Sequence, residues 1–247
     1  MLSEREKRRY SRQIILPDVG EKGQEALKAG KVMVVGAGGL GCPVLQYLAA
    51  AGVGKIGIVE FDQVSESNIH RQILYGSRDV GKLKSIIAKN ILEKINDLAV
   101  IEIFNLRLTA GNASRILSGW DIIIDATDNY ETRYVIDRFC SEGGIPMIHG
   151  AIYMHEGQVS VFNHRGAGSY AYYHPCDETR SGNPDPSSVG LFGVLPGTTG
   201  SIMASEAIKL ITGTGEVLAG KLLTFNTMNN SFITIDLPLP GLKQETR

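Results

Sequence analysis

The sequence predicts an α/β protein with a Rossmann-like, mainly parallel sheet that carries helices on both faces and continues into an antiparallel carboxyl-terminal half. In residues 31–71, an apolar strand leads through a glycine-rich turn into a helix and then into a second strand, which is the order of a βαβ unit. After residue 121 the strand–helix alternation fades, and residues 157–162 alternate as antiparallel strands do.

An amino-terminal helical arm is expected in residues 1–30. Ser3 and Glu6 have the spacing of a capping box, which marks the start of a helix. On pattern alone, the arginines of this arm, including Arg12, are interpreted as a solvated basic face. Residues 24–29 predict a short helix that the following glycine ends.

The glycine-rich turn has the spacing G-x-G-x-x-G, formed by Gly36, Gly38 and Gly41. In such units one glycine makes the tight turn, one lets the backbone approach a phosphate, and one lets the helix pack closely on the strand. Glu60 ends the second strand about twenty residues later, which is the context that the motif requires. We therefore expect a nucleotide phosphate at the amino end of the helix; a tight turn without a ligand is the alternative.

The next predicted elements are a helix in residues 81–96, a strand at 100–104, a helix at 110–117 and a strand at 121–126. Lys84 falls in the first turn of the first of these helices, where the helix dipole disfavours a cation. It is therefore either an idle surface lysine or one that a phosphate holds.

Polar residues follow directly after the fourth predicted strand. Asp125, Asp128 and Asn129 come at or just beyond its end. Because ligands of doubly wound sheets bind outside the carboxyl ends of the strands, we expect these residues on the same edge as Glu60. Asp128 is also a candidate N-cap for a helix at 130–140.

The remaining predicted elements are strands at 146–150 and 157–162, a helix at 198–211, and a hairpin of 222–225 with 232–235. Between them, residues 163–197 combine prolines, glycines, serines and tyrosines with little periodicity. We expect a long, exposed and flexible loop there, acting as a lid or a partner-binding element.

Composition fits one globular domain spanning residues 1–247, since the chain is 43% hydrophobic and 21% charged and shows neither a linker nor an internal repeat. A formal charge of −1 gives no overall attraction to nucleic acid or anionic lipid. Neither a run of about 18 apolar residues nor a signal peptide is evident, so a cytoplasmic location is expected. Cys42, Cys140 and Cys176 form no C-x-x-C pair, which argues against a disulfide framework or a zinc knuckle. A packing role is expected for Cys42.

Several short blocks of the sequence, taken in order, carry a resemblance to a known family. They are Arg12-Gln13-Ile14, the turn 36–41, Glu60 to Asp62, Ser67 to Gln72, Gly81 to Lys84, Asp125 to Asn129, Gly157-Gln158 and 193–209. In this order they resemble the MoeB/ThiF/HesA family, the bacterial relatives of ubiquitin-activating enzymes. The resemblance covers nearly the whole chain. It implies a nucleotide-binding half at 31–150 and a carrier-binding half that includes the loop 163–197.

The resemblance implies that the chain binds ATP and Mg²⁺ and adenylates the carboxyl-terminal Gly-Gly of a small ubiquitin-like protein, with release of pyrophosphate. Members of the family are typically homodimers. Glu60 would hold the ribose hydroxyls, although the family's usual residue there is Asp, and Asp128 would hold the metal. Arg12 would reach into the partner subunit's site. The other residues implied in nucleotide binding are Gly36, Gly38, Gly39, Gly41, Asp62, Asn68, Arg71, Lys84 and Asn129; those implied as catalytic are Arg12, Arg71, Lys84 and Asp128.

The implied reaction suits these residue types. A carboxylate that approaches the α-phosphate meets like-charge repulsion, so the reaction needs positioning and charge neutralisation, which Mg²⁺, arginine and lysine supply. A general base is not required, because the attacking carboxylate is already ionised.

Two features depart from the family pattern. Many relatives bind zinc through two C-x-x-C pairs, but residues 170–174 and 242–245 contain no cysteine, so we expect no structural zinc. Relatives that link covalently to the carrier use a loop cysteine at about Pro186. Cys176, ten residues earlier, is a candidate substitute, with an unreactive loop thiol as the alternative.

Three other functions compete with activation of a sulfur carrier for molybdopterin or thiamine-type biosynthesis. The first is adenylation of a small-molecule or tRNA-borne carboxylate, as in cyclic threonylcarbamoyladenosine formation, which a chain without basic character does not favour. The second is an NAD-dependent oxidoreductase, which would leave Arg71, Lys84 and Asp128 without a role. The third is a nucleotide-binding scaffold that docks a carrier without turnover, against which the intact ATP-site residues argue.

Overall fold

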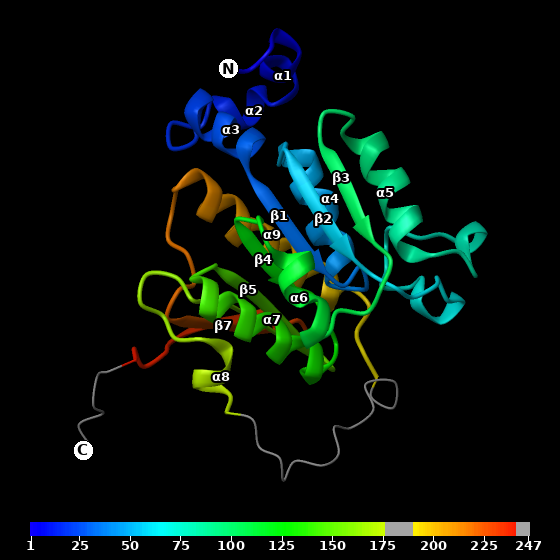
Figure 1. Ribbon diagram of the computed structural model, residues 1–247, viewed down its shortest axis with the longest axis vertical. Coiled ribbons are helices and arrows are strands. Elements are labelled where there is room, and N and C mark those ends of the chain that lie inside the picture. Colours follow the sequence, from blue (N-terminus) through cyan, green and yellow to red (C-terminus); the bar gives the residue numbers. More distant parts are fainter. Residues whose placement is uncertain (176–189, 241–247) are drawn as a thin grey trace.

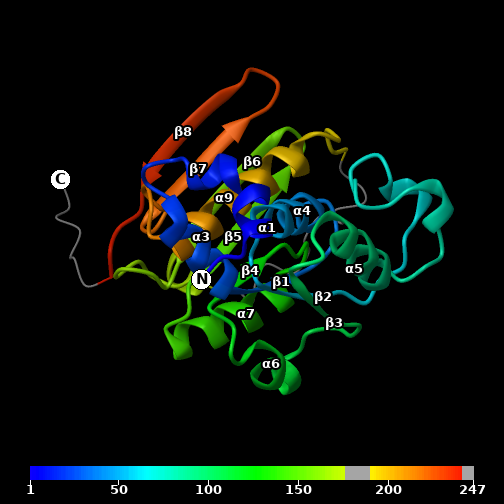
Figure 2. The same ribbon diagram turned by 90° about the horizontal axis from the view of Figure 1, so that it is seen from above.

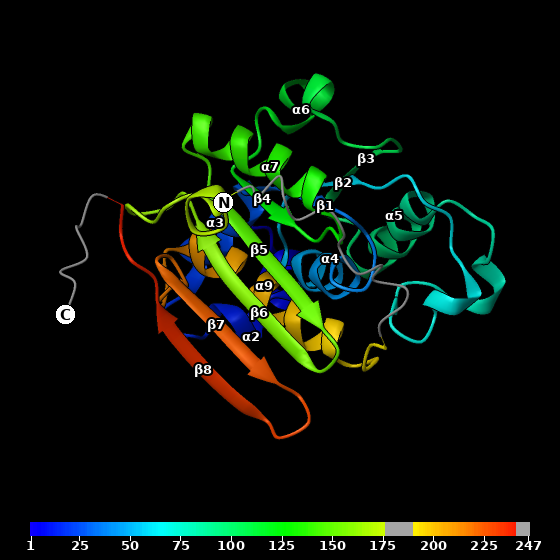
Figure 3. The same ribbon diagram turned by 90° about the horizontal axis from the view of Figure 1, so that it is seen from below.

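The computed structural model describes residues 1–175 and 190–240. One sheet runs through these residues with eight strands in the order β3-β2-β1-β4-β5-β6-β7-β8 (Figures 1 and 3). Neighbours from β3 to β5 pair in parallel and those from β5 to β8 pair antiparallel. The predicted fold class, a doubly wound parallel half that continues into an antiparallel half, is therefore confirmed.

The parallel strands are β1 (Lys31–Val35), β2 (Lys55–Val59), β3 (Val100–Phe104), β4 (Ile122–Asp125) and β5 (Met147–Tyr153). The antiparallel strands are β6 (Glu156–Phe162), β7 (Lys221–Asn226) and β8 (Ser231–Asp236). β1 and β4 are buried along almost their whole length, because helices cover both faces of the parallel half. The expected hairpin forms as β7 and β8, with β8 at the edge of the sheet.

Helices lie on both faces of the sheet (Figure 2). The first layer holds α3 (Gly20–Ala29), α4 (Gly41–Ala51), α5 (Lys84–Ile95) and α9 (Leu195–Thr212). The second layer holds α6 (Ala110–Leu117), α7 (Tyr130–Gly143) and α8 (Tyr170–Tyr173). Among the residues described, none of the helices combines the length and the apolar character that a membrane crossing needs.

The amino-terminal arm consists of α1 (Glu4–Arg9) and α2 (Ser11–Ile14), which lead into α3. The predicted capping box of Ser3 and Glu6 is present. Gln13 donates a side-chain hydrogen bond of 3.0 Å to the carbonyl of Ala51, the last residue of α4. The arm therefore lies at the amino ends of the parallel strands (Figure 1).

The expectation of one continuous loop in residues 163–197 is wrong at both ends. Ser169 caps α8, and Asp137 accepts hydrogen bonds of 2.7 and 2.9 Å from the backbone N–H groups of Tyr170 and Ala171, which fixes this helical turn. At the other end, α9 begins at Leu195, three residues before the prediction, because a proline is well placed in a first helical turn. Residues 176–189 and 241–247, which include Cys176, lie outside the described part of the chain.

Replacing Gly41 tests how tightly the fold is built at the glycine turn. A Cβ on Gly41 would overlap the carbonyl oxygen of Gly36, whereas a Cβ on Gly111 in α6 would meet only an ordinary contact at 3.9 Å. We predict that Gly41→Ala lowers the free energy of unfolding by about 3 kcal/mol or more, at the upper end of overpacking costs. Gly111→Ala, the matched control, should leave it unchanged or raise it by up to about 1 kcal/mol. Equal unfolding curves for the two variants in urea would contradict this packing.

Candidate nucleotide-binding site

The glycine turn sits against the ends of the neighbouring strands. Gly36 has φ +98° and donates its backbone N–H to Val59 at 2.9 Å. A Cβ on Gly36 would lie 2.6 Å from the carbonyl oxygen of Ala126. Only glycine has both the conformation and the space that this position needs, so the turn is held close to the carboxyl ends of β2 and β4.

The peptide of Ala37, in the middle of the turn, is held from both sides. Glu60 is 6% exposed, and its carboxylate accepts hydrogen bonds from the N–H groups of Ala37 at 2.9 Å and of Phe61 and Asp62 at 2.8 Å each. The buried Tyr75 donates its hydroxyl to the carbonyl of Ala37 at 2.7 Å. The turn therefore has its shape before any ligand arrives.

Three helices begin at this edge of the sheet without a side-chain cap: α4, α5 and α9. The start of α9 lies against the turn, since a Cβ on Gly39 would be 3.0 Å from Pro196. Free N–H groups and the positive ends of the helix dipoles favour an anion at such a place. The convergence of α9 with α4 was not predicted from the sequence.

Two of the expected phosphate-binding residues lie in the segment after β2. Asn68 ends a short 3₁₀ helix (Glu66–Asn68), and its carbonyl accepts the N–H of Arg71 at 3.0 Å. The backbone oxygen of Arg71 lies 3.8 Å from where a Cβ on Gly39 would be, so this segment borders the turn. The guanidinium of Arg71 donates to the carbonyl of Ser67 at 3.0 Å and is partly exposed.

Lys84 is the first residue of α5, and its side chain is only 5% exposed. The interpretation as an idle surface lysine is therefore wrong. Its ammonium lies 3.3 Å from the half-exposed carboxylate of Asp62. A buried ammonium is costly unless negative charge is close, so this position favours a further anionic partner.

Asp128 is exposed, and its carboxylate has neither a hydrogen bond nor an ion pair within residues 1–175 and 190–240. Its expected second role as an N-cap is wrong, because Asn129 caps α7 by accepting the N–H of Thr132 at 2.9 Å. The capping by its neighbour leaves the Asp128 carboxylate available at the edge.

Arg12 is not part of this edge. It is exposed on α2 beside Gln13, which is bonded to the last residue of α4, whereas the glycine turn precedes the first residue. The 11 residues of α4 span about 16 Å. Arg12 therefore lies far from the glycine turn of the same chain.

A buried polar network under the site was missed by sequence reasoning. The Asp125 carboxylate is 0% exposed and lies 3.0 Å from Nε of Arg133 on α7 and 2.8 Å from Nδ1 of His149 on β5. Burial alone would raise the pKa of Asp125, but the Arg133 charge and the His149 hydrogen bond lower it to about 2. Burial lowers the pKa of His149, which favours a neutral ring donating from Nδ1. The non-local pairing of β4 with β5 leaves no local sequence signal.

Two further side chains at the edge were also missed. Gln72 is 5% exposed and lies next to Gly38, and its Oε1 has no hydrogen-bond partner among the described residues. The exposed ring of Phe61, directly after Glu60, stacks under the guanidinium of Arg107 at 4.9 Å. An exposed aromatic ring next to Glu60, the residue predicted to bind the ribose, is suited to contact a base.

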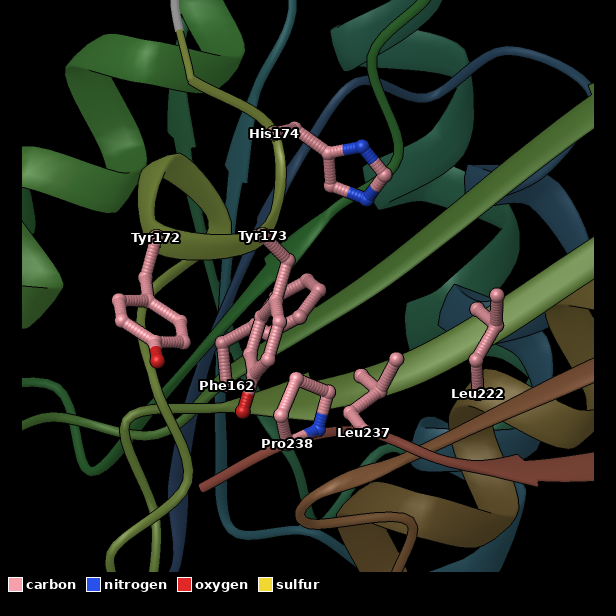
Figure 4. Close-up of a pocket in the computed structure, with 7 residues that line it drawn as sticks. All are labelled: Phe162, Tyr172, Tyr173, His174, Leu222, Leu237 and Pro238. Atoms are coloured by element: carbon pink, nitrogen blue, oxygen red, sulfur yellow. The ribbon is translucent and has the colours of Figure 1, made fainter. Parts of the chain in front are cut away.

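A separate apolar pocket lies elsewhere in the molecule (Figure 4). It is lined by Phe162, Tyr172, Tyr173, His174, Leu222, Leu237 and Pro238. Phe162 pairs with Met147, the first residue of β5, so the pocket is at the amino ends of the parallel strands. It is therefore at the opposite end of the sheet from the glycine turn.

The fold and this edge define a nucleotide-binding α/β protein with a preformed phosphate turn, a buried acidic residue after β2 and cations around it. The chain belongs to the ThiF family, whose model matches residues 10–244. The resemblance to MoeB, ThiF and HesA proteins is thereby confirmed. The binding roles of the individual residues stay predictions.

Curated relatives support the same family. A sulfur carrier protein adenylyltransferase from Thermus thermophilus is 47% identical over 231 residues, which covers 91% of this chain and 84% of that protein. A SAMP-activating enzyme E1 from Haloferax volcanii is 41% identical, with 92% and 84% covered. A probable adenylyltransferase/sulfurtransferase MoeZ from Mycobacterium tuberculosis is 44% identical, and this chain spans 61% of its length.

Solved structures share the fold. MccB of E. coli, in its structure with ATP, has a TM-score of 0.83 at 22% identity, covering 95% of this chain and 72% of that one. PaaA has a TM-score of 0.82 at 26% identity, covering 96% and 75%. At this level of identity, the likeness to MccB concerns the fold alone.

The buried network should make stability depend on acid. Because the pKa of Asp125 is lowered from its usual 3.8 to about 2 when folded, its contribution is present above about pH 4 and lost as the pH falls through about 2. We predict that Asp125→Asn lowers the free energy of unfolding by about 3 kcal/mol at neutral pH, since it leaves Arg133 buried without its counter-charge. The difference in free energy of unfolding between Asp125→Asn and the wild type should become smaller as the pH falls from about 4 towards 2.

Urea unfolding at several pH values measures this gap, with Asp128→Asn as the control. Because Asp128 is exposed and unpaired in the described structure, this variant should stay within about 0.5 kcal/mol of the wild type. A constant gap for Asp125→Asn at all pH values would contradict the assigned network.

Proposed function

We propose that this chain is an ATP-dependent adenylyltransferase that activates the carboxyl-terminal Gly-Gly of a ubiquitin-like sulfur-carrier protein. The observation that carries the proposal is the combination, at one edge, of a preformed glycine turn, the buried Lys84 ammonium and the exposed Asp128 carboxylate, which has no partner within the described residues. The names of the relatives from Thermus thermophilus and Haloferax volcanii point to the same activity. An oxidoreductase would leave this charge arrangement without a use.

The nucleotide fits the edge in one orientation. Its ribose hydroxyls would bind the carboxylate of Glu60, its base would lie on Phe61, and its phosphates would follow the turn to the uncapped starts of α4 and α9. Arg71 and Lys84 would supply the positive charge beside the phosphates. Glu60 keeps acceptor capacity for the ribose, because a carboxylate has about four lone-pair sites and three are used by backbone N–H groups.

Asp128 fits a role as the magnesium ligand. Mg²⁺ is usually bound through one or two carboxylates together with substrate phosphates and water. Asp128 is a carboxylate at this edge that has no partner in the part of the chain that the structure describes. When bound, the ion neutralises negative charge on the phosphates. Asn129 fixes the start of α7 beside it.

The reaction requires these residues to position the reacting groups and to neutralise their negative charge. One oxygen of the carrier's terminal carboxylate attacks the α-phosphorus, the bond to the bridging oxygen of the β-phosphate breaks, and pyrophosphate leaves with the electron pair. Arg71 and Lys84 offset the charge that gathers as these groups meet. The attacking group needs no proton removed.

A homodimer would complete the site. Arg12 is too far from the turn of its own subunit to reach it, and it is exposed beside Ile15 and Leu16, which are 66% and 52% exposed. Exposed apolar residues next to a charged side chain suit a surface that a second copy covers.

We also propose that residues 1–247 form a single domain, that the protein is cytoplasmic and that it holds no structural zinc.

Carrier-dependent exchange of labelled pyrophosphate into ATP tests this function. A purified sulfur-carrier protein that ends in Gly-Gly should stimulate exchange, and the same protein without its last glycine should not. Asp128→Ala should lower the rate at least about a hundredfold, while Glu131→Gln, which replaces an exposed residue in the first turn of the following helix α7, should not change it. Exchange that is stimulated by tRNA in place of the carrier would overturn the proposal. So would exchange that neither tRNA nor the carrier stimulates.

Mixing two inactive variants tests the contribution of the partner subunit. If Arg12 acts across the dimer, a mixed dimer of Arg12→Ala and Asp128→Ala subunits contains one complete site. Random reassembly of equal amounts should then restore about a quarter of the wild-type exchange rate. A mixture no more active than the separate variants would show that Arg12 does not act in this way.

A further inference from the structure

The network around Asp125 reaches the backbone next to the proposed magnesium ligand. Asp125 Oδ1 accepts the backbone N–H of Thr127 at 3.1 Å and its hydroxyl at 2.5 Å. The other oxygen, Oδ2, is held by Arg133 and His149. Thr127 directly precedes Asp128, so the orientation of one buried carboxylate fixes the start of the Thr127–Asp128 peptide.

Arg133 donates a hydrogen bond to the carbonyl end of the same peptide. Its Nη2 donates to the carbonyl of Thr127 at 3.3 Å, while its Nε bonds to Asp125. The N–H, the hydroxyl and the carbonyl of Thr127 are thus all bonded to two buried side chains. Asp128 itself is exposed and makes no such bond within the described residues, so its place is set by the peptide that carries it.

His149 is the member of this network that comes from a different strand. It pairs in register with Asp125 across β4 and β5. Its ring packs against the rings of Tyr170 and Phe162, with centroid distances of 5.0 and 5.9 Å. The aromatic contacts prevent the ring from turning away, which aims Nδ1 at Oδ2. Loss of this donor would leave Asp125 held on that oxygen by Arg133 alone.

We propose that His149 is a positioning residue, which acts through Asp125 and Thr127 to hold the Asp128 carboxylate where a magnesium–nucleotide complex needs it. This inference rests on the proposed function of the site. A misplacement of about 1 Å at a reacting or coordinating group can cost a factor of about a hundred, so a change in a buried hydrogen bond three residues away has a measurable effect. His149 touches neither the nucleotide nor the metal in this account.

Calorimetric titration with ATP, once with excess Mg²⁺ and once with EDTA, separates this role from a general structural one. His149→Leu should weaken binding of Mg·ATP about tenfold and binding of metal-free ATP less than about twofold. His149→Asn should bind Mg·ATP within about threefold of the wild type, because its amide nitrogen can donate in place of Nδ1. Thr127→Val is the second variant in case His149→Leu fails to fold. It removes the hydroxyl bond to Asp125 without changing the shape of the side chain, and it should weaken Mg·ATP binding in the same way.

A double-variant cycle with Asp128→Ala makes the test decisive. If His149 acts through Asp128, adding His149→Leu to Asp128→Ala should weaken Mg·ATP binding by less than about twofold. Equal losses with and without Mg²⁺, or the same tenfold loss in the Asp128→Ala background, would overturn the inference while leaving the proposed function intact. A wild-type chain that does not bind Mg·ATP would overturn the proposed function and, with it, this role.

Discussion

The close approach of the glycine turn to the end of β4 is the constraint on which the site depends. Gly36 leaves no room for a side chain against the Ala126 carbonyl, and Gly41 leaves none against Gly36. This crowding joins the start of α4 to the segment after β4. The glycine turn and the carboxylates of Glu60 and Asp128 consequently share one edge. A side chain at either glycine would separate them, whatever else remained in place.

The positively charged groups at this edge could take a phosphate as a further partner. Three helix starts without a side-chain cap lie at this edge together with Arg71 and Lys84. Within the described residues, the half-exposed carboxylate of Asp62 is the one ion-pair partner of the buried Lys84. A triphosphate would give Lys84 and Arg71 a further anionic partner, and Asp128 would offset the charge of the metal that accompanies it. The underlying network of Asp125, Arg133 and His149 is by contrast internally satisfied, which suits a rigid support.

The sequence was sufficient wherever local pattern decides structure. Apolar runs and glycine spacing predicted the βαβ unit, the parallel half and the hairpin of β7 with β8. The sequence was insufficient where distant residues decide the structure. Asp137 of α7 fixes α8 by accepting the backbone N–H groups of Tyr170 and Ala171, and Lys84 is buried by packing that its own helix does not reveal. The link from His149 to Asp125 arises only when β5 pairs with β4. The distance of Arg12 from the turn likewise follows from tertiary structure, although its role across a dimer was expected from the family.

A crystal structure of the chain with Mg²⁺ and a non-hydrolysable ATP analogue would show whether the nucleotide and the metal bind at this edge of the sheet. We expect the ribose on Glu60, the phosphates along the turn from Gly38 to Gly41 within reach of Arg71 and Lys84, and the metal on Asp128. A nucleotide bound elsewhere, such as in the apolar pocket at the opposite end of the sheet, would contradict it. So would a nucleotide at the turn whose metal makes no contact with Asp128.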